Sequence, residues 1–413
     1  MKTRPILVWL HRWTGLLMTA FLVVVGLTGS LLAYNSELER VFAPQLFAGP
    51  HPGVAPLDLA TLAERAQEMV PGARVVRVHM SEPDQVLFQF QPPKDAAPGS
   101  APLGFTEFFV DPYTGAELGR RIRGDLSQGT INLMPFVYDL HWRLALGSTG
   151  QIVLGVVAIA WTIDCFVAFY LTLPVSAPGF WRRWRTAWRI KRNSGFYRLN
   201  FDLHRASGLW LWPLLFVFAW SSVMFNIRPV FEWPMGQLFD FRSRMELFTQ
   251  LSQRPPNETP RLDWRAAQAQ GERLMAEEAM RLSFSVAQPI SLMYFDRFGV
   301  YIYSARGSRD IFERSPKGGD TAVMFDGDSG ALIDTDVPTG QRLGNTIESW
   351  LYALHMSRVF GRPYQLFVCM LGVVVAGLGV TGVYIWWRKR RARQSQRRPG
   401  STHNKASKAR LAC

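Results

Sequence analysis

The sequence has little cysteine, with three in 413 residues. Cys165 and Cys369 fall inside long apolar runs and Cys413 is the last residue, so none of them can cross-link the polar segments. The chain has no Cys-x-x-Cys-His motif for covalent attachment of haem and no cysteine cluster for zinc or an iron–sulfur centre. A metal site in this protein must therefore rely on histidine.

Two other features are missing. No Gly-x-Gly-x-x-Gly follows a predicted strand and opens a helix, so the sequence offers no dinucleotide site. Acidic residues are also outnumbered, with 32 Asp and Glu against 46 Lys and Arg, and the net charge is +14. Much of this charge adjoins apolar runs, above all at 181–192, where it marks the cytoplasmic side of a membrane. We therefore expect contact with membrane lipid and no nucleic-acid partner.

Hydrophobic residues make up 48% of the chain and gather in four long runs, each able to cross about 30 Å of hydrocarbon as a helix. The first run is longer than the apolar part of a signal peptide, so we expect it to be retained. The positive-inside rule places both termini in the cytoplasm and both long polar segments outside. The sequence predicts four transmembrane helices, at 1–36, 147–176, 199–228 and 361–388. It also predicts two cytoplasmic segments, a basic loop at 177–198 and a tail at 389–413.

The two external segments, 37–146 and 229–360, show the same order of predicted elements: one helix, several strands, and an amphipathic helix before the next span. In each segment the last predicted strand runs into a turn of the form Asp-x-x-(Thr or Ser)-Gly, at 111–115 and at 326–330. We interpret this as internal duplication. The predicted fold is an α-helical membrane protein, a four-helix transmembrane bundle with two external α+β domains.

Two histidine motifs also occur twice. His11 and His204 each begin a His-Arg-x-(Thr or Ser)-Gly sequence, whereas His141 and His355 are each followed by glycine after six residues and glutamine after ten. The first two are 193 positions apart and the second two 214 apart, close to the 215 that separates the turns. The first two lie near the cytoplasmic ends of their spans, and the second two precede spans on the outer side. Depth therefore pairs His11 with His204 and His141 with His355.

Two histidines that face each other from neighbouring helices form the ligand set of a low-spin haem b. We therefore expect two non-covalent bis-histidine haems, with iron held by His11 and His204 at the inner site and by His141 and His355 at the outer site. A zinc or copper path is the main metal alternative, but the spans lack the extra carboxylate, Cys and Met ligands that such a path needs.

Three charged residues near the inner histidines have expected roles. Arg12 and Arg205 directly follow these histidines, where they can reach the membrane interface and also bind haem propionates. Asp164 is the only carboxylate well inside a span, and we expect it to accept a hydrogen bond from an inner histidine or to pair with one of these arginines. Three further histidines match nothing in the other half and are interpreted as ordinary residues: His51, His79 and His403.

In these motifs the sequence resembles the PepSY-associated transmembrane helix family, which includes iron-regulated inner-membrane proteins that reduce ferric siderophores. The resemblance covers nearly the whole chain apart from the tail, and it also includes the Asp-Pro-Tyr-Thr-Gly turn at 111–115 and the Gly-Val-Tyr-Ile-Trp-Trp-Arg sequence at 382–388. The chain departs from the pattern at Gly327, where the second turn lacks proline, and at Asp164 inside the second span.

The resemblance implies a multi-pass protein of the bacterial inner membrane, with two PepSY-like periplasmic domains and two haem b groups, that moves electrons outward as an oxidoreductase. The implied donor is a separate flavoprotein or a membrane quinol. The implied acceptor is a periplasmic Fe(III) chelate, above all a ferric siderophore, which releases its iron on reduction. The alternative is a non-redox membrane module whose outer domains bind or inhibit a periplasmic partner, with the histidines packing the bundle.

Overall fold

The computed structural model describes residues 3–92, 103–311 and 320–397. They divide into two compact units. The first unit contains the residues up to 23, 160–215 and those from 374 onward, and the second contains 24–159 and 216–373. The boundary between the units falls within several long helices. Each unit therefore contains residues from both halves of the chain.

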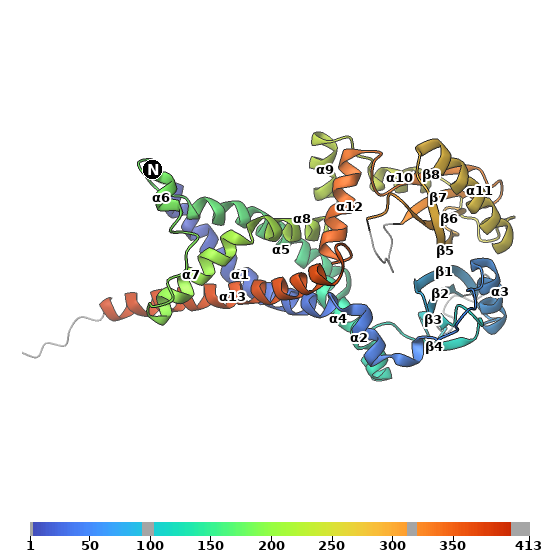
Figure 1. Ribbon diagram of the computed structural model, residues 1–413, viewed down its shortest axis with the longest axis horizontal. Helices are drawn as coiled ribbons and strands as arrows, with labels where there is room; N and C mark the ends of the chain where they lie inside the picture. Colours follow the sequence, from blue (N-terminus) through green and yellow to red (C-terminus); the bar gives the residue numbers. More distant parts are fainter. Residues whose placement is uncertain (1–2, 93–102, 312–319, 398–413) are drawn as a thin grey trace, which may run out of the picture. The chain divides into compact units, whose positions relative to one another are not determined.

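Three long apolar helices are uninterrupted, as the sequence predicts, and each could cross a membrane (Figure 1). They are α1 (Thr3–Leu32), α5 (Gly147–Thr172) and α13 (Gly361–Arg397). None has an acidic residue in its first turn, and their apolar residues continue around the whole helix, which is typical of helices surrounded by lipid or by other helices.

The third predicted span is not one straight helix. It forms α7 (Phe196–Trp210) and α8 (Trp212–Asn226), which are bent by 69° at a break at Leu211. Pro213 explains the break, because proline has no N–H to donate to the carbonyl of Leu209 and its ring clashes with that carbonyl. Within the described residues, three helices are long and apolar enough to cross a membrane, and the predicted fourth span is present only if the bent pair counts as one.

Shorter helices connect these spans to the polar segments. Two of them, α4 (Leu133–Arg143) and α12 (Leu343–His355), are the predicted amphipathic helices that end near the outer histidines. The sequence analysis did not predict the others: α2 (Asn35–Phe42), α6 (Phe180–Trp184), α9 (Arg228–Leu238), α10 (Arg244–Leu251) and the 3₁₀ turns η1 (Pro44–Leu46), η2 (Leu126–Gln128) and η3 (Thr130–Asn132).

The strands of both external segments form one antiparallel sheet of eight strands, in the order β4-β3-β2-β1-β5-β6-β7-β8. The halves meet where β1 pairs with β5, with Val78 opposite Leu292. The sequence analysis treated the segments as two domains, but their strands join edge to edge, so neither inner edge is exposed. The strands are β1 (Arg74–Glu82), β2 (Gln85–Gln91), β3 (Glu107–Val110), β4 (Glu117–Arg121), β5 (Val286–Phe295), β6 (Val300–Gly307), β7 (Thr321–Asp326) and β8 (Leu332–Asp336).

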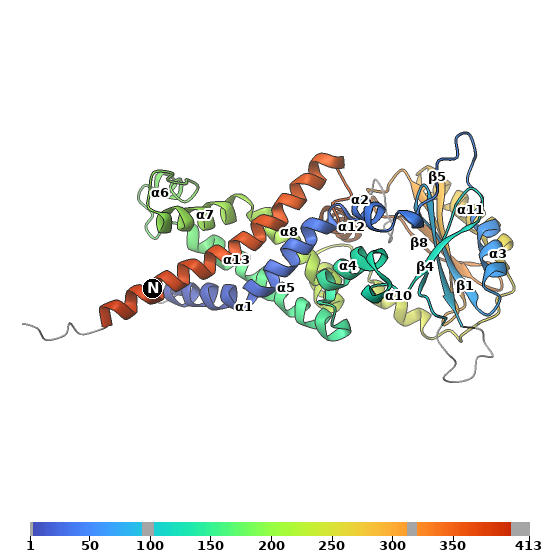
Figure 2. The same cartoon turned by 90° about the horizontal axis from the view of Figure 1, so that it is seen from below.

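Two helices cover the same face of this sheet, α3 (Leu59–Met69) before β1 and α11 (Trp264–Leu282) before β5 (Figures 1 and 2). Each begins at an aspartate, Asp58 or Asp263, whose side chain accepts a hydrogen bond from the backbone N–H three residues on. Alternate residues of the strands point into the core between the helices and the sheet. One continuous core results, and it includes Leu62, Ala66, Val78, Phe88, Phe108, Leu274, Met275, Leu292, Tyr303 and Phe325.

The two predicted turns have the same structure. The carboxylates of Asp111 and Asp326 each accept hydrogen bonds from the backbone N–H groups two and three residues on, at 2.7 and 3.3 Å in the first turn and 3.0 and 2.8 Å in the second. Gly115 and Gly330 close the turns with φ of +71° and +69°, a conformation that side chains disfavour. The shared sequence form therefore reflects a shared turn.

Gly327 stands where the first turn has proline, and the structure gives the reason. Its N–H donates a hydrogen bond of 2.9 Å to the carbonyl of Gly299, which a proline could not do. A Cβ at this position would also lie 2.9 Å from the Tyr294 ring. Local packing at the end of β7 therefore explains why glycine replaces proline in the second turn.

The acid stability of the second turn provides a test. Burial raises the pKa of Asp326, but hydrogen bonds from Ser329 and Asp328 and contact with Arg254 lower it to about 2, below its ordinary value. The carboxylate thus stabilises the fold above about pH 4, and this contribution is lost as pH falls from about 4 toward 2. We expect Asp326→Asn to cost roughly 1–2 kcal/mol at pH 7 and to flatten the decline of Tm between about pH 4 and pH 2.

Thermal unfolding of the solubilised protein, followed by tryptophan fluorescence, measures this effect. Glu277→Gln is the matched control, because Glu277 forms an exposed pair with Arg273 within α11 that contributes little to stability. If the Tm of the Asp326 variant fell with decreasing pH as steeply as that of the wild type, the lowered pKa of Asp326 would not be the cause of the acid sensitivity.

Candidate functional site: two facing histidine pairs

The structure brings together the histidines in the pairs that depth predicts. The rings of His11 and His204 have centres 6.3 Å apart in the first unit, and those of His141 and His355 have centres 6.3 Å apart in the second. The ring planes are inclined by 57° and 69°. Each pair joins one histidine from each half of the chain, so neither half contains a complete site.

The inner pair lies on α1 and α7. The Nδ1 of His11 donates to the carboxylate of Asp164 on α5, at 2.9 and 3.0 Å from its two oxygens. This is the first of the two roles expected for Asp164. The Nδ1 of His204 lies 3.0 Å from the hydroxyl of Thr381 on α13. The ring of each inner histidine is therefore fixed by the returning helix of its own half.

The outer pair lies at the ends of α4 and α12. The Nδ1 of His141 is 3.0 Å from the hydroxyl of Thr28 on α1, and the Nδ1 of His355 is 2.7 Å from the hydroxyl of Ser221 on α8. The rings of Phe218 and Phe225 lie 4.8 and 5.1 Å from the His355 ring. Here, too, each histidine is held by a helix of its own half.

The hydroxyl partners determine which ring nitrogen carries the proton. Thr28, Ser221 and Thr381 each donate their own hydroxyl proton to the backbone carbonyl four residues earlier, at 2.7, 2.6 and 2.8 Å. Each hydroxyl oxygen is then left to accept, so the histidine must donate from Nδ1–H. The carboxylate of Asp164 imposes the same tautomer on His11. All four histidines consequently keep a bare Nε2.

Burial keeps the outer histidines neutral. It lowers the pKa of His141 to about 4 and, together with the neighbouring His141, that of His355 to about 3. A neutral imidazole with Nδ1 bonded and Nε2 free is the form that ligates a metal, and the bond at Nδ1 fixes the orientation of the ring. Among the described residues, no hydrogen bond or ion pair involves the Nε2 of any of the four.

The separation of each pair fits one metal between two imidazoles. A ligating nitrogen lies about 2 Å from a first-row metal, and adding the radius of an imidazole ring on each side puts the two ring centres about 6 Å apart. Both pairs have this separation. The described residues contain no group of three or more His, Cys, Asp or Glu side chains that could hold a metal ion by themselves. A metal at either pair would therefore need most of its ligands from elsewhere.

Glycines leave space beside the rings. A Cβ at Gly29 would lie 3.1 Å from the Cε1 of His141, and one at Gly382 would lie 3.4 Å from the Cε1 of His204. Beside the inner pair, a Cβ at Gly15 would meet no described atom within 4 Å, and one at Gly208 would meet only Leu378, at 4.0 Å. Open space therefore adjoins Gly15, and a histidine ring adjoins Gly29 and Gly382.

The two arginines after the inner histidines differ. Arg205 pairs with Asp202 at 2.8 Å and donates to backbone carbonyls of the basic loop, including those of Thr186 and Ala187. It therefore holds that loop in place. Arg12 makes no hydrogen bond or ion pair with the residues that the structure describes. The expected propionate contact stays a prediction for both. Arg205 uses Nε and Nη2 for other hydrogen bonds, whereas all the donors of Arg12 are available.

The remaining histidines lie away from both pairs. His51 bonds through Nε2 to the carboxylate of Asp111 at 3.0 Å, and it thereby supports the first turn. His79 is buried within β1, opposite Ser291 of β5. His403 lies outside the described residues. The first two therefore have places within the fold, as the sequence analysis interpreted them.

Comparison with known families identifies the family of this chain. The model of the PepSY-associated TM region matches residues 8–389, which include both histidine pairs and most of each long helix. The chain belongs to this family. It is therefore a membrane protein with long apolar helices and an antiparallel sheet region. Within part of its length it is also 24% identical to an uncharacterized protein of Pseudomonas aeruginosa, over 163 residues that cover 39% of each chain.

Sequence reasoning predicted Asp164 as a partner of an inner histidine but missed the hydroxyl partners of the other three. Thr28 and Ser221 each lie seventeen residues after an inner histidine, so a hydroxyl recurs at the same offset in both halves. Tyr138 and Tyr352 each lie three residues before an outer histidine, in the sequence Tyr-x-Leu-His. Both signals are present in the sequence, but small hydroxyl residues are common in membrane helices and their repetition is evident only once the contacts are known.

Proposed function

We propose that the protein is a dihaem b electron-transfer protein of the bacterial inner membrane. One observation carries the proposal. Within each histidine pair the two ring centres are 6.3 Å apart, and in every ring Nδ1 is hydrogen-bonded while Nε2 is free. Two imidazoles fill only two of the six positions of an octahedral metal, and they complete the coordination of an iron whose other four ligands come from a porphyrin. The apolar helices and the adjacent glycines supply suitable walls.

When bound, each haem b would supply one-electron redox chemistry through its iron. The residues of the chain would hold it: His11 and His204 at the inner site, His141 and His355 at the outer site. Arg12 is available to bind a propionate at the inner site. Electrons would enter from a separate flavoprotein or a membrane quinol and leave to a periplasmic Fe(III) chelate, a ferric siderophore above all. Reduction to Fe(II) weakens the chelate and releases the iron.

This proposal places both termini in the cytoplasm and the eight-stranded sheet in the periplasm. The charge asymmetry supports it, because the basic residues gather in the loop at 181–192 and at 388–393 near the end of α13. It also includes internal duplication, which the repeated order of one helix and four strands in the sheet region supports. The second candidate is a non-redox module whose sheet binds a periplasmic partner, and it predicts a colourless protein.

The first prediction concerns stoichiometry. The purified protein should be red, with a sharp α-band on reduction, and should contain two haems per chain that acid acetone extracts, because no cysteine can form a thioether link. A pyridine haemochrome assay against protein concentration measures the ratio. A colourless protein would favour the non-redox module, and a ratio near one would remove one of the two sites.

The second prediction concerns Asp164. An anionic partner at Nδ1 makes His11 a stronger donor and favours the ferric state. We expect Asp164→Asn to retain the hydrogen bond, because the amide oxygen can still accept, and to raise the midpoint potential of one haem by tens of millivolts. A spectroelectrochemical titration separates the two haems. Thr381→Val, which removes a neutral partner of the same pair, is the control and should shift this potential less.

The third prediction is that the two pairs fail differently. His355→Ala should remove one haem and abolish reduction of an external ferric chelate, while the other haem still accepts electrons from the cytoplasmic side. His204→Ala should leave a haem that external reductants can reduce but that receives no electrons from within. Inverted membrane vesicles and intact cells give access to the two sides. Normal reduction of external chelate by the His355 variant would rule out a relay between the pairs.

A further inference from the structure

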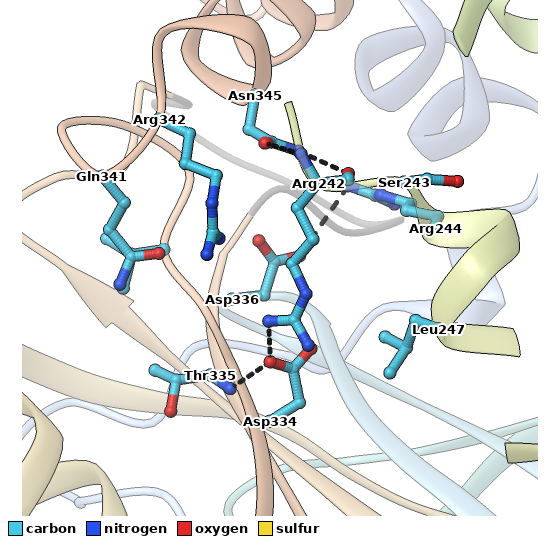
Figure 3. A pocket seen from close by; sticks show the side chains of 11 residues that line it. Arg242, Ser243, Arg244, Leu247, Asp334, Thr335, Asp336, Gln341, Arg342 and Asn345 are labelled. Atoms are coloured by element: carbon cyan, nitrogen blue, oxygen red, sulfur yellow. Dashed lines mark hydrogen bonds and ion pairs between the residues drawn. The ribbon is translucent and has the colours of Figure 1, made fainter. Parts of the chain in front are cut away.

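A small pocket lies in the second unit, between the start of α10, the strand β8 and the start of α12 (Figure 3). Its volume is about 40 Å³. Figure 3 shows Arg242 reaching to Asp334 across the pocket, with Arg342 and Gln341 to one side of it and Arg244 and Leu247 to the other. Three arginines therefore surround a space of a few water volumes.

Each of the three arginines has a carboxylate within ion-pair distance, but only the guanidinium of Arg242 is hydrogen-bonded to its partner. Arg242 contacts Asp334 directly and is thereby paired. Arg244 lies 3.8 Å from Asp336 and 3.5 Å from Glu348, and Arg342 lies 3.5 Å from Asp240.

Among the described residues, the guanidinium groups of Arg244 and Arg342 donate no hydrogen bond. Each guanidinium has five N–H donors arranged to bind a carboxylate with two parallel hydrogen bonds. Two guanidinium groups at one pocket therefore have N–H donors available to bind an anion. The side chain of Gln341 adds a further neutral donor there.

The pocket is connected to the outer histidine pair by α12. Asn345 lines the pocket near the start of this helix and His355 is its last residue, so the two are about 15 Å apart along the helix axis. Tyr352 lies between them on α12, and its ring centre is 5.5 Å from that of Phe225, which contacts the His355 ring. Aromatic side chains therefore occupy the interval between the pocket and the pair.

We propose that this pocket binds a free carboxylate of an anionic ferric chelate and so holds the substrate close to the outer histidine pair. The proposal rests on the proposed function and names its substrate class as carboxylate-bearing chelates. The volume suits one carboxylate, so the body of the chelate would remain at the mouth of the pocket. The redox step transfers one electron from the quinol or flavoprotein donor, by way of the outer site, to Fe(III). No atoms are exchanged, and the chelate gains one negative charge as Fe(II) forms.

Binding is tested first with gallium(III) citrate, which resembles the ferric chelate in charge and size and cannot be reduced under these conditions. Calorimetry on the purified full-length protein gives its Kd. We expect Arg342→Gln and Arg244→Gln each to weaken binding by about 10-fold or more, since each removes charged hydrogen bonds. Arg273→Gln is the matched control, because Arg273 is an exposed arginine on α11 that is paired with Glu277. Affinity in the control should stay within about 2-fold of the wild type.

Turnover provides the second readout. In each pocket variant, KM for ferric citrate should rise by a larger factor than kcat falls, and kcat/KM for ferric citrate should drop about 10-fold relative to that for an uncharged ferric trihydroxamate. The midpoint potentials of both haems should not change. Thermal unfolding shows that each variant is folded, and two separate arginines ensure that one unstable variant does not decide the result.

The outcomes separate the two proposals. A wild type that binds gallium citrate through these arginines but contains no haem would contradict the proposed function and leave an anion pocket. A wild type that contains two haems and reduces ferric citrate, with unchanged affinity in both pocket variants, would overturn the pocket and leave the dihaem proposal in place. Absence of gallium citrate binding by the wild type would also overturn the pocket.

Discussion

The structure of both candidate sites depends on one interaction, the hydrogen bond from each histidine Nδ1–H to an acceptor on a neighbouring helix. Without it, either ring nitrogen could carry the proton and the ring could rotate about χ2. With it, the ring is held and the Nε2 lone pair points away from the partner. Three of the acceptors are hydroxyls whose own protons are committed to backbone carbonyls. The helical backbone therefore determines the histidine tautomer.

These hydrogen bonds and the histidine pairs connect the chain in two complementary ways. Each hydrogen bond joins helices of one half, as His141 is joined to Thr28 and His355 to Ser221. Each histidine pair, in contrast, takes one member from each half. The sheet follows the same rule, because its two four-stranded parts meet only where β1 pairs with β5. A half on its own would orient its histidines but would complete neither site, and the inner edge of its sheet would be open.

The sequence predicts the long helices, the histidine pairing and the turns, because periodic apolar runs and repeated motifs are strong local signals. It predicts one helix followed by several strands in each external segment, whereas the edge strands β4 and β8 are short and polar and carry no apolar alternation from which they could be predicted. The joining of two external segments into one sheet depends on pairing between strands more than 200 residues apart, which no local pattern reports. Pro213 was a readable signal for the break at Leu211, since a proline inside a helix removes a hydrogen bond.

One difference between the two sites follows from the acceptors alone. The inner pair has a carboxylate, Asp164, behind one of its histidines, whereas both outer histidines have neutral hydroxyls and His355 is flanked by two phenylalanine rings. Under the proposed function, a negative partner stabilises the more positive, ferric state, and neutral apolar surroundings destabilise it. The inner site would then have the lower potential and the outer site the higher one. Electrons would pass from the inner pair to the outer pair with a favourable free energy, which is the direction that reduction of an external ferric chelate requires.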